Sequence, residues 1–274
     1  MPEVAAGPDL SDIADRDLLV AAGLEAGALA LGHFRRPLEI TEKPGDQGPV
    51  TNADLAVDRA LGEVLQAARP GYGWLSEETV DGPERLAADR VFIVDPIDGT
   101  RAFIAGEDGW CIALSVVDRT GVCAAAAVLP ARGEVYAAAR GAGATLDGVA
   151  IRASARADLE EASFLAAAPT LRPQHWPGGV PAVRRSVRSS LVWRLCLAAA
   201  GRYDALMTVR PCWEWDVAPG ALMAAEAGLA VSDAGGAVLR YNQPHPRLPS
   251  LMAVPPAMRP EILRRRGLTD PCAP

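Results

Sequence analysis

Hydrophobic positions at the start of the chain recur with the spacing of helices. From residue 9 to about residue 36, apolar side chains return every third or fourth position, with Asp9 or Ser11 as candidate N-caps and Pro37 as the stop. A second run of this kind spans residues 51–69. The pattern therefore predicts two long amphipathic helices in the first quarter of the chain.

Shorter apolar runs follow. Turn-forming residues stand at both ends of each run, which is typical of β-strands. Residues 72–75 predict a short strand, and the β-branched run at 91–94 predicts a buried strand that ends in an acid, Asp95. Three further runs, separated by hairpin-like turns, predict an antiparallel meander: 110–117, 122–129 and 134–139. Residues 43–49 are rich in proline and glycine and predict a mobile loop that could form a lid.

Glycines and a polar stretch mark a candidate domain boundary near residue 150. We expect an N-terminal α+β domain over residues 1–150 and a C-terminal α/β domain over residues 151–274, because strand-like and helix-like runs alternate in the second half. Those runs are the strands 163–167, 205–209 and 250–254, the helices 191–200 and 217–227, and a basic C-terminal helix.

Composition narrows the possible partners and the compartment. With 274 residues, 50% of them hydrophobic, the chain can bury a large core. Its net charge of −7 argues against binding to a nucleic-acid polymer or an anionic membrane, so small ligands are the expected partners. No run reaches membrane-spanning length, and the acidic N-terminus lacks the pattern of a signal peptide. Five widely spaced cysteines indicate reduced thiols, and we expect a cytoplasmic protein.

The candidate chemistry centres on the sequence Asp95-Pro96-Ile97-Asp98-Gly99-Thr100. Pro96 is expected to stop the strand, so that Asp95 and Asp98 project from a turn into one space. A short helix from residue 99 to 104 would then offer its first N–H groups to an anion beside these acids. Carboxylates repel a phosphate unless cations lie between them. The sequence therefore predicts a divalent-metal site that handles a phosphate ester.

Other acids could join this site, although each has a plainer interpretation. Glu77 and Glu78 follow the strand at 72–75 and could be a solvated pair, and Asp216 could be only the N-cap of the helix that follows it. Asp95 and Asp98 could likewise belong to a simple capped turn. The three histidines of the chain lie far apart in sequence, so a hard metal with oxygen ligands is favoured over a histidine-bound zinc.

Three motifs in order resemble the inositol monophosphatase superfamily of magnesium-dependent, lithium-sensitive phosphatases. They are Ser76-Glu77-Glu78-Thr79, Asp95-Pro96-Ile97-Asp98-Gly99-Thr100 and Trp215-Asp216-Val217-Ala218-Pro219-Gly220. The resemblance covers nearly the whole chain and implies an α/β (α+β) fold, a layered αβαβα sandwich, and commonly a homodimer. Haloacid-dehalogenase phosphatases also place an acid and Gly-Thr after a strand, but they space their two acids one residue apart, unlike Asp95 and Asp98.

The resemblance implies a role for each matching residue. The metal ligands for two or three Mg²⁺ would be Glu77, Asp95, the carbonyl of Ile97, Asp98 and Asp216, with Asp95 bridging two ions. Asp54 and Thr100 would orient and help to deprotonate the attacking water, with Glu77 also in the catalytic set. Substrate contacts would come from Asp98, Gly99, Thr100, Arg101 and Asp216. Pro219 stands where the family usually has alanine, which should alter the helix start slightly.

The substrate class stays open between members of that superfamily. Glu214-Trp215-Asp216, Arg101 and Phe103 are similar to the 3'(2'),5'-bisphosphate nucleotidases, which convert 3'-phosphoadenosine 5'-phosphate to AMP and phosphate. Ala102 departs from that group, and Arg-Ala-Phe also resembles histidinol phosphatases. Residues 207–211 lack the acid that inositol-1-monophosphatases carry there. We expect the nucleotidase, with the other two phosphatases and a non-enzymatic, metal-dependent phosphoester sensor as alternatives.

Overall fold

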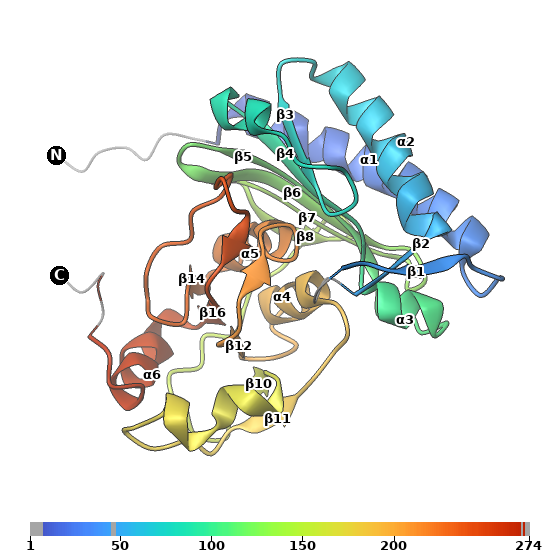
Figure 1. The fold of residues 1–274 in the computed structure, drawn as a ribbon. Coiled ribbons are helices and arrows are strands. Elements are labelled where there is room, and N and C mark those ends of the chain that lie inside the picture. Colours follow the sequence, from blue (N-terminus) through green and yellow to red (C-terminus); the bar gives the residue numbers. More distant parts are fainter. Residues whose placement is uncertain (1–7, 45–47, 270, 272–274) are drawn as a thin grey trace, which may run out of the picture.

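Two long helices cover one face of the main sheet. The computed structural model describes residues 8–44, 48–269 and 271. Helix α1 (Leu10–His33) starts at the cap Asp9, and α2 (Asn52–Ala68) starts at the cap Thr51. Their buried apolar stripes pack on the sheet side that holds Phe92, Leu114 and their neighbours (Figure 1). Both helices were predicted from the spacing of apolar residues, and both are present.

The main sheet consists, in the described residues, of seven strands in the order β3 to β9. Only β3 and β4 are parallel, and the remaining neighbours are antiparallel, so the predicted meander is present. The strands are β3 (Gly73–Ser76), β4 (Val91–Asp98), β5 (Cys111–Asp118), β6 (Gly121–Leu129), β7 (Glu134–Ala139), β8 (Gly143–Leu146) and β9 (Val149–Ala150).

The expectation that Pro96 ends its strand was wrong. Strand β4 continues through Asp98, and its pairing with β5 is irregular between Asp95 and Asp98. A proline has no N–H to give to a ladder, and this irregularity is the kind of position at which a sheet accommodates it. Both acids therefore stand on a bulged strand rather than on a turn.

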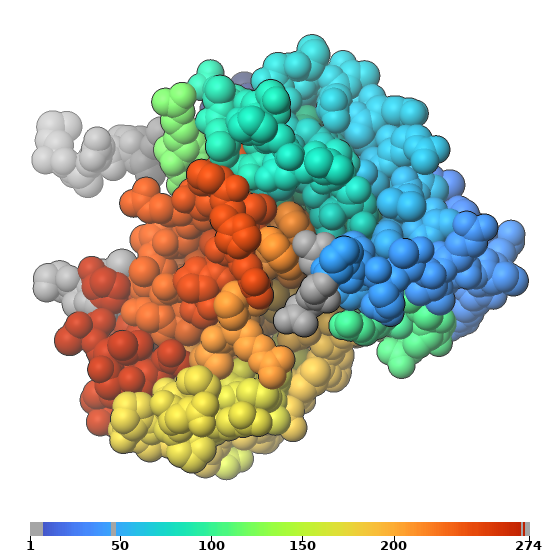
Figure 2. Space-filling view, in the orientation of Figure 1, coloured from blue at the N-terminus to red at the C-terminus, as the bar shows by residue number. Residues whose placement is uncertain are grey.

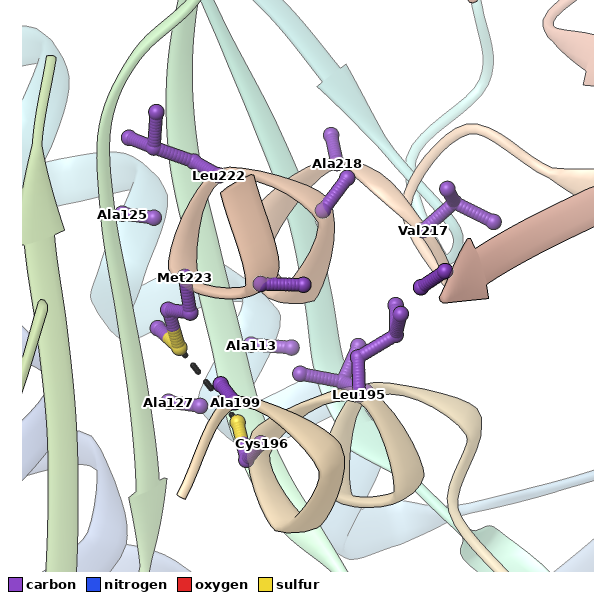
Figure 3. Close-up of a cluster of buried hydrophobic side chains, with 14 of the residues drawn as sticks. Ala113, Ala125, Ala127, Leu195, Cys196, Ala199, Val217, Ala218, Leu222 and Met223 are labelled. Carbon is purple, nitrogen blue, oxygen red and sulfur yellow. Dashed lines mark hydrogen bonds between the residues drawn. The ribbon is translucent and has the colours of Figure 1, made fainter. Parts of the chain in front are cut away.

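Two short helices pack on the opposite face of this sheet. Figure 3 shows α4 (Leu191–Ala199) and α5 (Ala218–Glu226) against the small side chains of β5 and β6, among them Ala113 and Ala125. The helices also approach each other closely, since a Cβ at Gly220 would lie 2.5 Å from the Cβ of Leu195. Alanine and glycine at these contacts let the start of each helix reach the end of β4, where the candidate acids lie.

A second sheet and a final helix complete the layers. In the described residues its strand order is β11-β10-β12-β16-β14, and α6 (Arg259–Arg265) packs on its outer side (Figure 1). The strands are β10 (Ser163–Leu165), β11 (Arg184–Ser186), β12 (Ala205–Thr208), β14 (Ala230–Ser232) and β16 (Leu251–Val254). The expected αβαβα layering is thus present. The division into domains at residue 150 stays a prediction. One apolar cluster contains residues of both halves.

Two small ribbons and several short helices connect these layers. Strands β1 (Ile40–Glu42) and β2 (Pro49–Thr51) pair antiparallel, and part of the loop expected over residues 43–49 lies outside the described residues. The other short elements are β13 (Cys212–Trp213), β15 (Arg247–Leu248), α3 (Thr100–Ile104), and the 3-10 turns Pro83–Ala87, Ala168–Leu171, Pro173–His175 and Pro256–Met258. Within the described ranges, none of the helices combines the length and apolar character needed to cross a bilayer.

Candidate active site

Three carboxylates from distant parts of the sequence meet at one point. Glu77, Asp95 and Asp216 each offer an oxygen, and these oxygens all lie within 4.8 Å of one another. The parallel strands β3 and β4 carry the first two acids to the same edge of the sheet, and the turn before α5 brings the third. Clustered carboxylate oxygens are the donor set that hard divalent cations prefer. The donors therefore fit a metal site.

The electrostatics of the cluster favour a bound cation. Burial raises the pKa of Asp95 well above its ordinary value, and repulsion from Glu77 and Asp98 raises it further. Burial and the neighbouring acids also raise the pKa of Asp216. Acids that disfavour their own charged forms in this way are stabilised as carboxylates when a cation lies between them.

The single lysine of the chain lies beside this cluster. The Nζ of Lys43 donates to Oε1 of Glu77 at 2.5 Å and to Oε1 of Glu78 at 2.8 Å. Burial nevertheless raises the pKa of Glu78 to about 7, although the contact with Lys43 lowers it. Glu78 is thus placed against the lysine and lies outside the group formed by Glu77, Asp95 and Asp216.

Asp98 is fixed by the start of α4. Its Oδ2 accepts hydrogen bonds from Ser190 Oγ at 2.5 Å and from the backbone N–H of Val192 at 2.7 Å. Burial raises the pKa of Asp98, and these two hydrogen bonds oppose the rise. Sequence reasoning missed Ser190, because nothing in the motif indicates that a helix 92 positions further on would meet this acid.

Asp54 and Thr100 meet next to these acids. Thr100 Oγ1 lies 3.2 Å from Asp54 Oδ1 and 3.1 Å from the carbonyl oxygen of Ile97. The other Asp54 oxygen accepts from the backbone N–H and the hydroxyl of Thr51, at 2.9 and 2.6 Å, in the capping box of α2. Burial raises the pKa of Asp54 despite these bonds. The carboxyl group is therefore held rigidly with one oxygen turned to Thr100.

Gly99 has a conformation that a side chain would disturb. Its φ of 104° lies in the left-handed region, and an added Cβ would stand 2.9 Å from the carbonyl oxygen of Gly109. Glycine at this position lets the backbone turn from β4 into α3, which presents Thr100 to the site.

Asp216 does not cap the helix that follows it, contrary to the plainer interpretation. The N-cap position of α5 is Val217, without a side-chain hydrogen bond, and Pro219 lies in the first turn as expected. Asp216 Oδ2 instead accepts from the backbone N–H of Trp213 at 3.4 Å. This carboxylate is thus held by the strand before it and remains directed at the other acids.

Glu214 is turned away from the cluster. It is fully buried, and its two oxygens accept from the backbone N–H groups of Asn242 and Gln243 at 2.6 and 3.0 Å. Burial raises its pKa to about 7, and those two N–H groups lower it. The glutamate of the Glu-Trp-Asp motif therefore holds the loop at Asn242 and Gln243 in place and does not face the substrate.

The acids form the floor of a pocket of about 420 Å³. Its described lining residues are Gly48, Pro49, Glu77, Asp95, Ile97, Asp98, Gly99, Thr100, Arg101, Ala102, Ser189, Trp213 and Asp216. Every predicted metal ligand is among them, as are Gly99, Thr100 and Arg101, whereas Asp54 lies behind Thr100. Ser189 was not assigned to the site from the sequence, because it belongs to no motif.

A half-buried arginine lies near the acids. Arg194, on α4, donates to the carbonyl oxygens of Ser189 and Ser190 at 3.0 and 3.1 Å. Burial lowers the pKa of its guanidinium, and attraction to Asp98 and Asp216 opposes that effect. The site therefore has a permanent positive charge on the α4 side in addition to Lys43 and Arg101.

The chain is similar to known proteins in sequence and in fold. The model of the inositol monophosphatase family matches residues 13–263. An inositol-1-monophosphatase of Rhizobium meliloti is 33% identical over 80% of this chain and 85% of its own. A 3'-phosphoadenosine 5'-phosphate phosphatase of Mycobacterium tuberculosis is 34% identical over 73% of this chain and 74% of its own. The crystal structure of the extragenic suppressor protein SuhB from Bartonella henselae superposes with a TM-score of 0.77 at 25% identity, covering 92% of this chain and 98% of that one.

Proposed function

The chain belongs to the inositol monophosphatase family, and from that premise we propose that it is a magnesium-dependent phosphatase of 3'-phosphoadenosine 5'-phosphate. The coarser part of this statement needs no proposal: the chain is a phosphatase, an enzyme that hydrolyses phosphomonoesters. The observation that carries the proposal is the convergence of Glu77, Asp95 and Asp216 beside the Asp54–Thr100 pair in one pocket.

The family is metal-dependent, and we expect the acidic cluster to be the metal-binding site. Two or three Mg²⁺ would be held by Glu77, Asp95, Asp98, Asp216 and the carbonyl of Ile97, with Asp95 shared between ions. Bound there, the ions would neutralise the phosphate dianion, lower the pKa of a coordinated water and stabilise the leaving oxygen. The hydrogen bond from the Ile97 N–H to Asp95 Oδ1 at 3.0 Å fixes the orientation of the shared carboxylate.

The chain's own residues would move the proton of the attacking water. A threonine hydroxyl has one proton, and Thr100 can give it to Asp54 Oδ1 while its oxygen accepts the proton of a water. Burial raises the pKa of Asp54 and so makes this carboxylate a stronger base than an exposed one. The phosphate would lie against the backbone N–H groups of Gly99 and Thr100. No covalent enzyme intermediate is needed.

The charges around the pocket favour a doubly phosphorylated substrate over a polyol phosphate. Arg101 lines the pocket, so an anion besides the scissile phosphate would meet positive charge there. All acids among the described lining residues are candidate metal ligands, so none remains to bind the hydroxyl groups of an inositol ring. Inositol-1-monophosphatase is the second candidate, supported by the name of the Rhizobium relative.

A substrate panel tests the proposal. Phosphate release is measured with Mg²⁺ on 3'-phosphoadenosine 5'-phosphate, inositol 1-phosphate and histidinol phosphate at matched concentrations. We expect kcat/KM for the bisphosphate to exceed the other two by at least about tenfold, the equivalent of one additional charge-assisted contact. Equal or higher values for inositol 1-phosphate or histidinol phosphate would contradict the substrate assignment. Saturable binding without phosphate release would favour the sensor.

Metal binding should stabilise the protein more as the pH rises. The pKa values of Asp95 and Asp216 are higher in the metal-free folded protein than in the unfolded chain, where they are about 4. These acids therefore stabilise the metal-free fold at a pH below their unfolded pKa values, and this stabilisation is lost as the pH rises through their folded pKa values. We expect the increase in Tm caused by Mg²⁺ to grow between about pH 4 and pH 8. Differential scanning calorimetry with and without Mg²⁺ measures it, and a shift independent of pH would speak against the cluster as the binding site.

We also propose the oligomeric state and the cellular compartment of the protein. We infer a homodimer, which light scattering on the purified protein would detect as twice the chain mass. We also infer a reducing, cytoplasmic setting, since the four cysteines in the described part of the chain are buried and free.

A further inference from the structure

Ser190 contacts the candidate metal ligand Asp98 from outside the pocket. The serine is fully buried and is not among the described residues that line the cavity. The blue segment around β2 and the orange segment around β13, which carry parts of that lining, come to one face of the molecule in Figure 2. Because Ser190 lies beneath the surface, it can act on a bound ion only through another residue, and its hydroxyl contacts Asp98.

The hydroxyl of Ser190 has two partners at once. Its oxygen accepts the backbone N–H of Trp193 at 2.9 Å, which makes Ser190 the N-cap of α4. Its single proton goes to Asp98 Oδ2 at 2.5 Å, since an ionised carboxylate can only accept. One side chain therefore starts the helix and also holds an acid that lies 92 positions earlier in the chain.

The two oxygens of Asp98 are unequally occupied. Oδ2 accepts the Ser190 hydroxyl and, at 2.7 Å, the backbone N–H of Val192, and these two bonds use its two lone pairs. Within the described part of the chain, Oδ1 has a single donor, the backbone N–H of Leu191 at 3.4 Å. Oδ1 is therefore the oxygen that remains for a cation, and the start of α4 sets the direction in which the carboxylate presents it.

We propose that Ser190 is a positioning residue of the metal site, whose hydroxyl holds Asp98 with Oδ1 directed at the cations. The inference rests on the proposed function, because it takes Asp98 as a metal ligand, and it deepens that function by giving a role to a residue of another layer. Without the hydroxyl, Oδ2 keeps only the N–H of Val192, and the carboxylate can rotate. Hydrogen bonds of this kind behind a metal ligand are typically worth about 10- to 100-fold in metal affinity or activity.

Three substitutions separate this role from the capping of α4. Ser190→Gly removes the hydroxyl but leaves a tolerated N-cap, Ser190→Ala removes the hydroxyl and leaves a poor N-cap, and Ser190→Thr keeps both functions. Mn²⁺, which replaces Mg²⁺ at oxygen sites, is titrated without substrate in a calorimeter. We expect its dissociation constant to rise about tenfold or more in Ser190→Gly and in Ser190→Ala, and to stay within about threefold in Ser190→Thr.

Ser115→Ala is the matched control. Ser115 is also fully buried, but its hydroxyl donates to the carbonyl oxygen of Ile93 at 3.1 Å, so its loss should change Mn²⁺ binding less than about twofold. Weakened binding in Ser190→Ala with normal binding in Ser190→Gly would show that the serine serves only α4. Normal binding in both would show that the hydroxyl is dispensable, and either result overturns the inference.

A double-variant cycle with Asp98→Asn connects the effect to that acid. Ser190→Gly should weaken Mn²⁺ binding much less in the Asp98→Asn background than in the wild type, because the charge that it orients is already gone. Equal losses in both backgrounds would reveal a general disturbance of the fold and overturn the inference. If Asp98→Asn alone binds Mn²⁺ as the wild type does, the proposed metal assignment fails. Weak binding by Asp98→Asn with normal binding by Ser190→Gly and Ser190→Ala contradicts the inference alone.

Discussion

Asp95→Asn is expected to lower kcat by at least about a thousandfold, or roughly 4 kcal/mol of transition-state stabilisation, without unfolding the protein. Asp95 is buried, meets Glu77 and Asp216 within the same 4.8 Å group, and is the acid proposed to be shared between ions. Asparagine keeps the shape but removes the charge that would hold two cations together. Phosphate release at saturating Mg²⁺ measures the effect.

Metal-free Asp95→Asn should also melt at a higher temperature than the metal-free wild type near pH 7. The substitution removes a buried charge that Glu77 and Asp98 repel. Glu78→Gln is the matched control, because Glu78 contacts Lys43 beside the site but lies outside the acid group, and this variant should retain activity within about tenfold. Activity of Asp95→Asn close to the wild-type value would refute the metal assignment.

Thr100→Ala and Asp54→Asn are each expected to lower kcat by about 10² to 10⁴, the range of general-base catalysis. Thr100 and Asp54 form one proton path, so their effects should not add: the double variant should be little worse than the poorer single variant. Because these residues are not proposed metal ligands, the Mg²⁺ concentration at half-maximal activity should change far less than kcat. Steady-state kinetics over a Mg²⁺ series measure both quantities.

Asp58→Asn is the control for the Asp54 variant. Asp58 lies one turn further along α2 and accepts the hydroxyls of Ser76 and Thr79 at 2.5 and 2.6 Å, away from Thr100. Its substitution should change kcat only a few fold. Additive losses in Thr100→Ala and Asp54→Asn, or a large loss in Asp58→Asn, would contradict a shared proton path.

The layers of the fold could be predicted because burial imposes a period on the sequence. The stripes of α1 and α2 and the runs of β4 to β7 each face one packed layer, and such faces are visible as spacing alone. The acids of the site were also visible, because short motifs place them at strand ends and at a helix start. The prediction that these acids, spread over 140 positions, lie together in space rested on the family resemblance. The spacing of residues cannot show which strand ends and helix starts converge.

Other features depend on contacts that no local pattern encodes. The extension of β4 past Pro96 is a property of its pairing with β5, and the anchoring of Asp98 depends on Ser190 in another layer. Glu214 was grouped with the substrate motif, but its position follows from the loop at Asn242 that its carboxylate holds. Tertiary context decided each of these, so sequence reasoning had no signal for them.

Anomalous diffraction from crystals soaked in Mn²⁺ and inorganic phosphate tests the central claim most directly. Mn²⁺ replaces Mg²⁺ at oxygen sites and scatters strongly enough to be located. We predict two or more peaks at roughly 2.0–2.3 Å from carboxylate oxygens of Glu77, Asp95, Asp98 or Asp216, with phosphate bound between them and Gly99. Crystals in which Mn²⁺ supports phosphate release, but in which no peak lies on these four acids, would contradict the account.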